Sequence, residues 1–564
     1  MNNYTNTENK VRRPRIALIT NHGYAGINIP VGGAPDTGGQ NFYVNSKAQA
    51  LEELGMDVTI FTRGGFPFFK SEVIREGIEN LSDHIRYVYV PGGGDMFIHK
   101  EDIAPALTEE TKWLDDFISA EAAAEGIRPE DYYECFDTHY WDAAVIGVLL
   151  IERWHDKIAY DFIKDCSDGV LASGLTPFEG DTKHKLSMST EVELHLGHIA
   201  KKIYKGKTSA QILEILCPYA SDSYPLTYTK TNPFPYKDIK EATLLGKALL
   251  DNLNINGLKL YELLHNANRH IWTPHSTSII KERNYWDKKP SSVRWLKFIE
   301  RNSHEEFICK HTRLFCSTSP EIWQNLYCYQ KQRTEQIFNY PPCLDTELFK
   351  PRTKDELKDV YEFLSSKSGI DVSTLKNSKI IFESSRMDKT KRKDILLKAF
   401  SKFVDKTEKT FLFIGGGPNT SEVFKDLEAT LESLENIKNK AFLLGFIPSD
   451  IISEIFSVPD LFVSASEMEG FGMSVSQAAA AKVAVVSSDL IPFSTQFAPD
   501  AAEIVKAGDI DAFAASMLEL LENDKKRAEN AQKLYDIALE LNWVNTSKKY
   551  IEWYHEKFGF NSPQ

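Results

Sequence analysis

The sequence predicts an α/β protein built from two doubly wound parallel sheets, and three observations support this prediction. The chain has 564 residues, which is too long for one hydrophobic core, so two or three domains are expected. Residues 461–487 run as strand, glycine turn, alanine-rich helix and strand, which is one βαβ unit of a parallel sheet. Residues 15–62 show the same order, with a strand at 15–20, a helix at 40–54 and a strand at 57–62. Each half of the chain therefore contains the repeating unit of a doubly wound sheet.

The composition is typical of a globular protein and unlike that of a nucleic-acid or membrane protein. Hydrophobic residues make up 42% and charged residues 26% of the chain. The formal net charge of −14 argues against a general affinity for nucleic acid or anionic lipid. No apolar run approaches the ~18 residues that span a bilayer, and the polar start lacks the apolar core of a signal peptide. Seven cysteines without a Cys-x-x-Cys pair indicate reduced thiols, so we expect a cytoplasmic protein.

Glycine turns stand where ligands bind in parallel sheets, at the carboxyl ends of strands. Gly38 and Gly39 come directly before the first helix, and Gly470 and Gly472 come before the alanine-rich helix. Glycine allows the backbone to approach a ligand closely, and the amides at a helix start favour a phosphate. Glu469 adds a carboxylate that can hold sugar hydroxyls. Either turn alone is equally typical of an ordinary βα connection.

The second turn resembles the E-x7-E region of retaining glycosyltransferases of the GT-B fold, glycosyltransferase family four. The matching residues are Glu469, Gly470, Phe471, Gly472, Met473, Ser474, Val475, Ser476, Gln477 and Ala478. The resemblance implies that Glu469 and the backbone of 471–474 hold the donor sugar. The family's second Glu, which grips the nucleotide ribose, is Gln477 here. Two interpretations of Gln477 stay open, since it either contacts the ribose or forms a capping box with Ser474.

A basic loop supplies the catalytic cations that the resemblance implies. The family's S-R-L-D-x-x-K stands here as residues 385–391, and it assigns Arg386 and Lys391 to the donor diphosphate. Fixed cations stabilise the charge that develops on a leaving nucleoside diphosphate. We expect the neighbouring Lys389, Arg392 and Lys393 to be solvated. Two more donor-binding residues are expected in turns at strand ends. Gly416 lies in a glycine turn, and Phe446 lies in a loop that resembles the family's nucleobase loop.

The first half of the chain resembles the sucrose-phosphate synthase and mannosylfructose-phosphate synthase branch of this family. The similar runs are 22–24, 36–40, 61–63 and 90–97, followed by Lys100. They imply that Gly38 and Gly39 cradle the donor diphosphate. The residues implied on the acceptor side are His22, Gln40, Arg63 and Lys100.

Two histidine signatures complete the resemblance. Residues 138–143 match a T/S-H-Y-x-D pattern, whose histidine, His139, faces the donor hexose near the reacting carbon in that branch. Residues 273–278 match T-x-H-S-L-G, which assigns His275 to the acceptor side. A lone histidine would more often be structural and hydrogen-bond to a loop carbonyl. Because the neighbouring runs also match, we favour the functional interpretation of His139.

The resemblance implies the GT-B fold, in which two Rossmann-like doubly wound domains face each other across a cleft. We expect a disordered lead at 1–14, an acceptor-side domain at 15–345 and a nucleotide-sugar domain at 346–540. A last helix at 541–564 is expected to return to the first domain. A mainly helical insertion at about 152–268 carries no catalytic motif, and it offers a lid, an acceptor-site wall or an oligomer contact.

The implied activity is hexosyl transfer, with retention, from a UDP-, GDP- or ADP-linked glucose or mannose to a small hydroxylic acceptor that is phosphorylated or otherwise anionic. No cofactor and no metal are expected, because the one D-x-D spacing, Asp509 to Asp511, falls in a late surface segment. Neither nucleic acid nor an integral membrane segment is expected. Two alternatives stay open: a lipid- or polysaccharide-directed transferase of the same fold, and a catalytically silent sugar-nucleotide-binding subunit.

Overall fold

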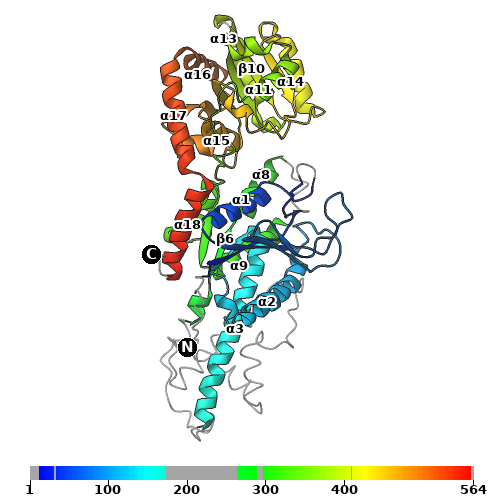
Figure 1. The fold of residues 1–564 in the computed structure, drawn as a ribbon, viewed down its shortest axis with the longest axis vertical. Coiled ribbons are helices and arrows are strands. Elements are labelled where there is room, and N and C mark those ends of the chain that lie inside the picture. Colours follow the sequence, from blue (N-terminus) through cyan, green and yellow to red (C-terminus); the bar gives the residue numbers. More distant parts are fainter. Residues whose placement is uncertain (1–11, 31–33, 173–262, 289–295, 408, 561–564) are drawn as a thin grey trace, which may run out of the picture. The chain divides into compact units, whose positions relative to one another are not determined.

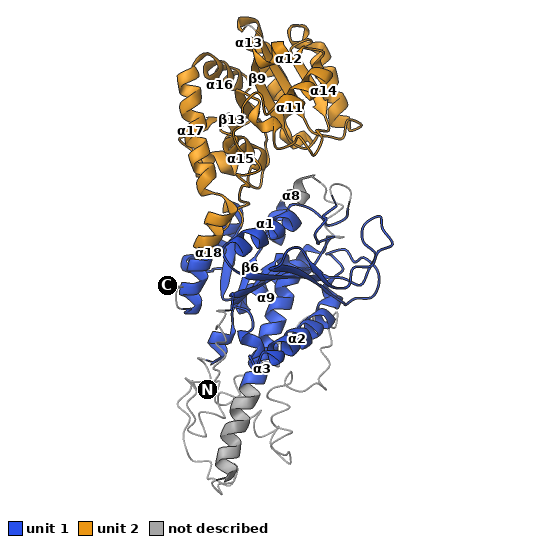
Figure 2. Ribbon diagram, viewed as in Figure 1, with its two compact units in different colours: residues 1–317, 321–338, 551–564 blue, residues 318–320, 339–550 orange. Residues whose placement is uncertain are grey.

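The computed structural model describes residues 12–30, 34–172, 263–288, 296–407 and 409–560, and the chain divides into two compact units (Figure 2). Unit 1 comprises residues 1–317, 321–338 and 551–564, and unit 2 comprises residues 318–320 and 339–550. Each unit contains one sheet with helices packed against it, as the two βαβ patterns predict (Figure 1). The limits of 345 and 540 inferred from the sequence stay predictions.

Unit 1 contains an eight-stranded sheet in the order β3-β4-β2-β1-β5-β6-β7-β8. The pairs from β4 through β7 are parallel, and β3 runs antiparallel to its neighbour β4. The strands are β1 (Arg15–Thr20), β2 (Asp57–Arg63), β3 (Gly77–Asn80), β4 (Ile85–Val90), β5 (Cys135–His139), β6 (His270–Thr273), β7 (Leu314–Ser317) and β8 (Ile337–Asn339). The main helices are α1 (Gly39–Glu53), α2 (Leu107–Ala124), α3 (Tyr140–Ala172), α8 (Ser278–Lys288), α9 (Phe298–His311) and α10 (Pro320–Gln324).

The register of three central strands brings the sequence signatures of unit 1 to one edge of the sheet. Thr20 at the end of β1 pairs with His139 at the end of β5, and His139 pairs with Thr273 at the end of β6. The loops that follow these strands therefore start side by side. They carry His22, Tyr140 and His275.

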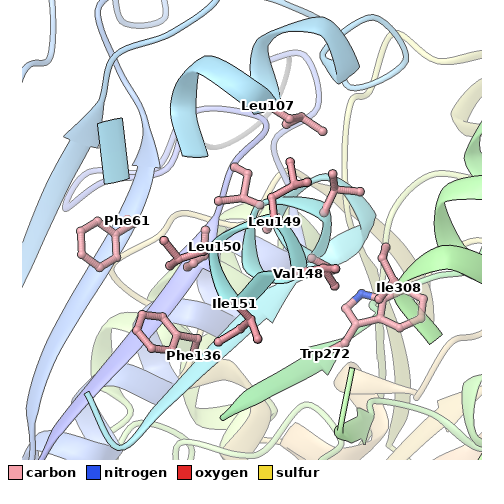
Figure 3. Close-up of a cluster of buried hydrophobic side chains, with 14 of the residues drawn as sticks. Phe61, Leu107, Phe136, Val148, Leu149, Leu150, Ile151, Trp272 and Ile308 are labelled. Carbon is pink, nitrogen blue, oxygen red and sulfur yellow. The ribbon is translucent and has the colours of Figure 1, made fainter. Parts of the chain in front are cut away.

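The core of unit 1 forms around the first turns of α3 (Figure 3). Residues 148–151 of this helix form an unbroken apolar run, Val-Leu-Leu-Ile, in which every side chain is buried. They pack with side chains from the sheet and from α2 and α9, namely Phe61, Leu107, Phe136, Trp272 and Ile308. Burial of one such side chain contributes about 1.5–3 kcal/mol, so this cluster fixes α3 directly behind His139.

Unit 2 contains a six-stranded sheet in the order β11-β10-β9-β12-β13-β14, and all its pairs are parallel. The strands are β9 (Lys379–Ser384), β10 (Thr410–Gly415), β11 (Ala441–Gly445), β12 (Leu461–Ser464), β13 (Ala484–Ser488) and β14 (Glu503–Val505). The helices are α11 (Lys358–Ser368), α12 (Val372–Lys376), α13 (Lys393–Phe403), α14 (Glu422–Ser433), α15 (Met473–Ala480), α16 (Ile510–Glu522), α17 (Asp524–Glu540) and α18 (Trp543–Phe558). Side-chain caps define several helix starts, as where Ser421 accepts from the amide of Phe424.

The last turns of α18 belong to unit 1. Tyr554 donates a 2.8 Å hydrogen bond to Glu134, directly before β5, and Arg313 donates to the carbonyl of Lys557 at 2.6 Å. These contacts tie the end of the chain to the amino-terminal side of β5 and β7.

The predicted insertion at 152–268 lies mostly outside the described residues. Its first part, as far as Ala172, continues α3. Among the described helices, none combines the length and the apolar character that crossing a membrane requires.

Candidate functional site

Two histidines from different signatures form one pair at the sheet edge of unit 1. His139 is fully buried at the end of β5, and His275 follows β6. Nδ1 of His139 lies 3.0 Å from Nε2 of His275, and the two rings stack with their centroids 5.2 Å apart. Burial lowers the pKa of His139 to about 4, although the Asp137 carboxylate opposes this, so the imidazole is neutral at physiological pH. The structure thus joins two residues that the sequence places 136 positions apart.

His22 and Gln40 lie at the same edge. Nδ1 of His22 donates a 3.0 Å hydrogen bond to the buried carboxylate of Asp142, and the centroids of the His22 and Tyr140 rings lie 4.5 Å apart. Gln40 donates to Thr20 at 3.0 Å and to the carbonyl of His139 at 3.3 Å. Both side chains therefore hold the loops around His139. Their assignment to the acceptor stays a prediction.

Tyr140 is a site residue that the sequence reasoning missed. It is buried and has a φ of 79°, a left-handed conformation that a bulky residue rarely adopts. Its phenolic oxygen receives hydrogen bonds from Lys281 and Arg301, both at 2.6 Å, and from Ser276 at 3.3 Å. Burial alone would raise the pKa of a phenol, but the two cations outweigh it and lower the pKa of Tyr140. The signal was present, since Tyr140 and Ser276 stand inside the two histidine signatures.

A pocket beside these residues has a cationic lining. It is formed by Lys100, Glu101, Ala104, Trp141, Lys281, Leu296, Lys297, Phe298, Glu300, Arg301 and His304. Four of the side chains are Lys or Arg, and two are carboxylates. Arg301 is held rigidly, because Glu305 accepts from its Nε at 2.7 Å and the carbonyl of Ser276 accepts from Nη2. Three of the four cations also form ion pairs with carboxylates, so the lining offers an anion charged hydrogen-bond donors rather than an excess of positive charge.

Lys100 and Arg63, both predicted on the acceptor side, are engaged with the protein in this structure. Lys100 lines the pocket but forms an ion pair with Asp36, and Glu101 lies 3.3 Å from its ammonium. Arg63 donates to three carbonyls of the 92–96 loop at 2.8–3.0 Å, so it shapes this glycine loop. The acceptor role of each stays a prediction.

Asp36, His99 and Glu101 are the one group among the described residues whose metal-ligating atoms lie close together. The ammonium of Lys100 already lies against both carboxylates of this group. The carboxylate of Asp509 is also engaged, because it accepts from the amide of Ala512 at 2.9 Å and caps α16. Chemistry without a metal stays a prediction.

Gly38 and Gly39 open helix α1 and border open space. A Cβ added at either glycine would have no other atom within 4 Å. Gly38 is the residue before the helix, and its extended backbone has no positive φ. Nothing within the described protein therefore requires glycine here, whereas a ligand phosphate close to the backbone would.

In unit 2, Lys391 and Glu469 meet although 78 residues separate them. The ammonium of Lys391 donates to Oε1 of Glu469 at 2.6 Å and lies 3.4 Å from the carbonyl of Met468. Both side chains are largely buried, with 8% of Lys391 and 16% of Glu469 exposed. Arg386, on the same loop, is exposed. The arrangement combines one exposed cation, Arg386, with one ion pair at the carboxyl ends of β9 and β12.

Lys393 corrects the expectation of a solvated basic loop. Its ammonium is buried, donates to the carbonyls of Ser385 at 2.8 Å and Gly415 at 2.5 Å, and pairs with the buried Glu383 at 3.0 Å. Arg392 is also paired, with Asp394 and Glu467. Only Lys389 of the three is exposed as expected, with a loose 3.6 Å contact to Glu422. Lys393 therefore joins the ends of β9 and β10 beneath the loop.

The turns after β10 and β11 hold the two further donor-site candidates. Gly416 has a φ of 116°, and a Cβ there would lie 1.8 Å from the carbonyl oxygen of Ser385. Phe446 is 69% exposed although it is a large aromatic side chain. Exposed aromatic faces of this kind suit stacking on a planar ligand. The nucleobase assignment stays a prediction.

The start of α15 decides against one interpretation of Gln477. The helix begins at Met473, with Gly472 before it at a φ of 105° and no side-chain cap. Ser474 therefore lies inside the first turn and cannot be the residue that caps the helix, so the proposed capping box is wrong. The alternative, ribose contact by Gln477, stays a prediction. Phe471 is buried against Phe493 and Phe497, while Met473 is 38% exposed.

Comparison with known proteins identifies the class. Residues 369–535 match the family described as Glycosyl transferases group 1, and this segment lies within unit 2. A solved sucrose-phosphate synthase from Thermosynechococcus elongatus superposes with a TM-score of 0.55, over 97% of this chain and 100% of that chain, at 17% identity. A trehalose-6-phosphate synthase gives a TM-score of 0.50 at 10% identity, over 98% and 100% of the two chains. The chain has the GT-B fold, and its residues 369–535 match the glycosyl transferases group 1 family.

Two curated relatives show how much of the chain the sequence similarity covers. Mannosylfructose-phosphate synthase of Agrobacterium fabrum is 23% identical over 489 residues, covering 84% of this chain and 76% of the relative. D-inositol 3-phosphate glycosyltransferase of Xylanimonas cellulosilytica is 31% identical over 168 residues, which is 29% of this chain and 36% of the relative. The first similarity spans both units, whereas the second spans about a third of the relative's length.

Proposed function

We propose that this protein is a retaining hexosyltransferase that moves glucose or mannose from a nucleotide sugar to a small phosphorylated or otherwise anionic sugar-like acceptor. The observation that carries the proposal is the cationic pocket of unit 1. Its Lys281 and Arg301 converge on the phenolic oxygen of Tyr140, one residue after His139. Charged donors that converge in this way bind a phosphate or a carboxylate strongly, which favours an anionic over a neutral acceptor.

The donor half of the proposal rests on unit 2. Arg386 and Lys391 would stabilise the charge that develops on the departing nucleoside diphosphate. Glu469, fixed by Lys391, would accept hydrogen bonds from sugar hydroxyls. Attack by the acceptor hydroxyl on the face that the diphosphate leaves, through an oxocarbenium-like state, would retain the anomeric configuration.

The relatives support the acceptor class. Both the mannosylfructose-phosphate synthase and the sucrose-phosphate synthase are named for a sugar phosphate product. The pocket of this chain supplies the chemistry that such a phosphate needs, namely several Lys and Arg side chains with limited exposure. In this account Lys100 exchanges Asp36 for the phosphate when the acceptor binds.

The test is a crossed screen of UDP-, GDP- and ADP-linked glucose and mannose against matched pairs of phosphorylated and free sugars. We expect nucleoside diphosphate release with one donor class, and a kcat/KM at least about tenfold higher for the phosphorylated member, equivalent to about 1.4 kcal/mol. NMR of the product would give the anomeric configuration, and turnover in excess chelator would test metal independence. Equal rates with phosphorylated and free acceptors would rule out the phosphate pocket.

Variants of the pocket lysines test whether the pocket binds the acceptor rather than the donor. Lys281→Met and Lys100→Ala should raise the acceptor KM much more than the donor KM. The control is Lys310→Met, which removes an exposed charge from α9, the helix that carries Arg301. It should leave both constants unchanged.

A silent sugar-nucleotide-binding subunit is the second candidate, and Gln477 is the observation that favours it. The family's charged residue is replaced there, so donor binding without turnover is conceivable. Slow hydrolysis of the donor in the absence of an acceptor would exclude this candidate. Tight binding of nucleoside diphosphate without any hydrolysis or transfer would support it.

A further inference from the structure

A fully buried ion pair lies beneath the two active-site histidines. Lys47 of α1 and Asp137 of β5 are both completely inaccessible, and the ammonium of Lys47 donates to Oδ2 of Asp137. Oδ1 of Asp137 accepts from the hydroxyl of Thr273 at 2.6 Å. Buried ion pairs add little stability compared with a packed apolar pair, because two charges must be removed from water. Core packing therefore does not explain why both charges are present.

The Asp137 carboxylate of this ion pair also lies close to the ring of His139. Oδ1 of Asp137 lies 3.7 Å from Nε2 of His139, too far for a hydrogen bond but close enough for a strong charge effect in the interior. Nε2 of His139 is buried and has no other hydrogen-bond partner among the described residues. The Asp137 carboxylate is therefore the charged group that acts on this nitrogen.

We propose that the Lys47–Asp137 ion pair is a positioning device that fixes the proton of His139 on Nε2. His139 then accepts a hydrogen bond at Nδ1 from Nε2–H of His275, and His275 presents the lone pair of its Nδ1 as an acceptor for a substrate hydroxyl.

The argument follows from the proton count. Burial lowers the pKa values of both His139 and His275, so each ring is neutral and carries one N–H. Burial would raise the pKa of Asp137, but the ammonium of Lys47 lowers it to about 2, so it is a carboxylate. The 3.0 Å contact between the rings needs one N–H and one lone pair. If His139 donated from Nδ1, the lone pair on its Nε2 would face the Asp137 carboxylate, which is repulsive.

The consequence for the reaction rests on the proposed function. A hydroxyl that attacks a sugar carbon has to lose its proton, and a hydrogen bond to a lone pair favours this loss. His275 with an N–H at Nδ1 would instead donate to the hydroxyl oxygen and weaken it as a nucleophile. The tautomer set by Asp137 therefore decides which of two opposite effects His275 has on the acceptor.

The test is imidazole NMR on the full chain labelled with ¹⁵N-histidine, which needs no substrate. Long-range ¹H–¹⁵N correlation distinguishes protonated from unprotonated ring nitrogens, and His139→Gln and His275→Gln assign the two rings. We expect an unprotonated Nδ1 and a protonated Nε2 on both rings of the wild type. In Lys47→Met/Asp137→Asn, which removes both charges, the preference of His139 should disappear.

The matched control is Arg153→Met/Asp115→Asn, which removes the buried charges of a 2.8 Å ion pair between α3 and α2. It should lower stability without moving either histidine spectrum. A protonated Nδ1 on wild-type His139 would overturn the proposal, and this result does not depend on whether the double variant folds. Unchanged tautomers in a folded Lys47→Met/Asp137→Asn protein would overturn it as well. Absence of any sugar transfer would refute the proposed function and leave the tautomer result standing.

Discussion

Replacing Lys391 by Met should slow turnover strongly while the protein still folds. Its ammonium lies 2.6 Å from Glu469 and belongs to the loop proposed to receive the leaving diphosphate. Loss of one fixed donor to a developing charge costs about 2–4 kcal/mol of barrier, which corresponds to a kcat about 30- to 10³-fold lower. The stability cost is smaller, about 1–3 kcal/mol, because Glu469 keeps some contact with water when its partner is lost.

The assay pairs kcat with a melting curve and uses two further variants. Glu469→Gln keeps a hydrogen-bond acceptor for Lys391 and should reduce donor use with little change in Tm. Lys398→Met removes a partly exposed 3.0 Å pair with Asp394 on α13, and it should change neither quantity by much. A kcat within about threefold of the wild type in Lys391→Met that is still folded at the assay temperature would refute the assignment, since that corresponds to less than about 1 kcal/mol.

Further predictions concern the nucleotide, the pH dependence of stability and the interior of unit 1. Gln477→Glu should change the Kd for nucleoside diphosphate in a calorimetric titration, and an unchanged Kd would argue against ribose contact. Burial raises the pKa of Glu110 to about 8, although Asn21 donates to it and Arg63 lies nearby. Between its ordinary value of 4.5 and about 8 the folded protein holds a proton that the unfolded chain releases, so the free energy of unfolding should fall as pH rises. Glu110→Gln should remove this decline of up to about 1.4 kcal/mol per pH unit in denaturant titrations, and an unaltered pH slope would show that Glu110 is not its source.

The strands and helices of both sheets could be predicted because their signals are local. The run from Arg15 to Thr20 and the run from Leu461 to Val463 are apolar and bounded by turns, and both are strands in the structure. The α/β class and the GT-B architecture followed from these units and from the family resemblance. Helix starts were less predictable, as α15 shows, because Gly472 ends the turn in a backbone conformation that the residue pattern does not specify.

Burial and pairing of charged side chains could not be inferred, because they depend on contacts across the fold. Lys393 stands in a basic run that is typical of a solvated loop, yet its ammonium is enclosed by the ends of β9 and β10. Lys47 lies on α1 among residues of helical spacing, and only the strand pairing shows that it meets Asp137. Tyr140 was visible in the sequence, but its role emerges only when Arg301 is brought against it from α9.

The glycines of the two units give a last prediction, because they are required for different reasons. Gly416 is required by the fold, since a Cβ would lie 1.8 Å from a backbone oxygen and the φ of 116° strains any other residue. Gly39 is not, because a Cβ there meets nothing within 4 Å and alanine favours a helix. Gly416→Ala should therefore reduce the free energy of unfolding by about 1–3 kcal/mol or more, and so lower Tm. Gly39→Ala should keep or raise Tm and yet weaken nucleoside diphosphate binding, since its methyl group would occupy the space proposed for a phosphate. Undiminished binding by Gly39→Ala would show that this open space is not part of the donor site.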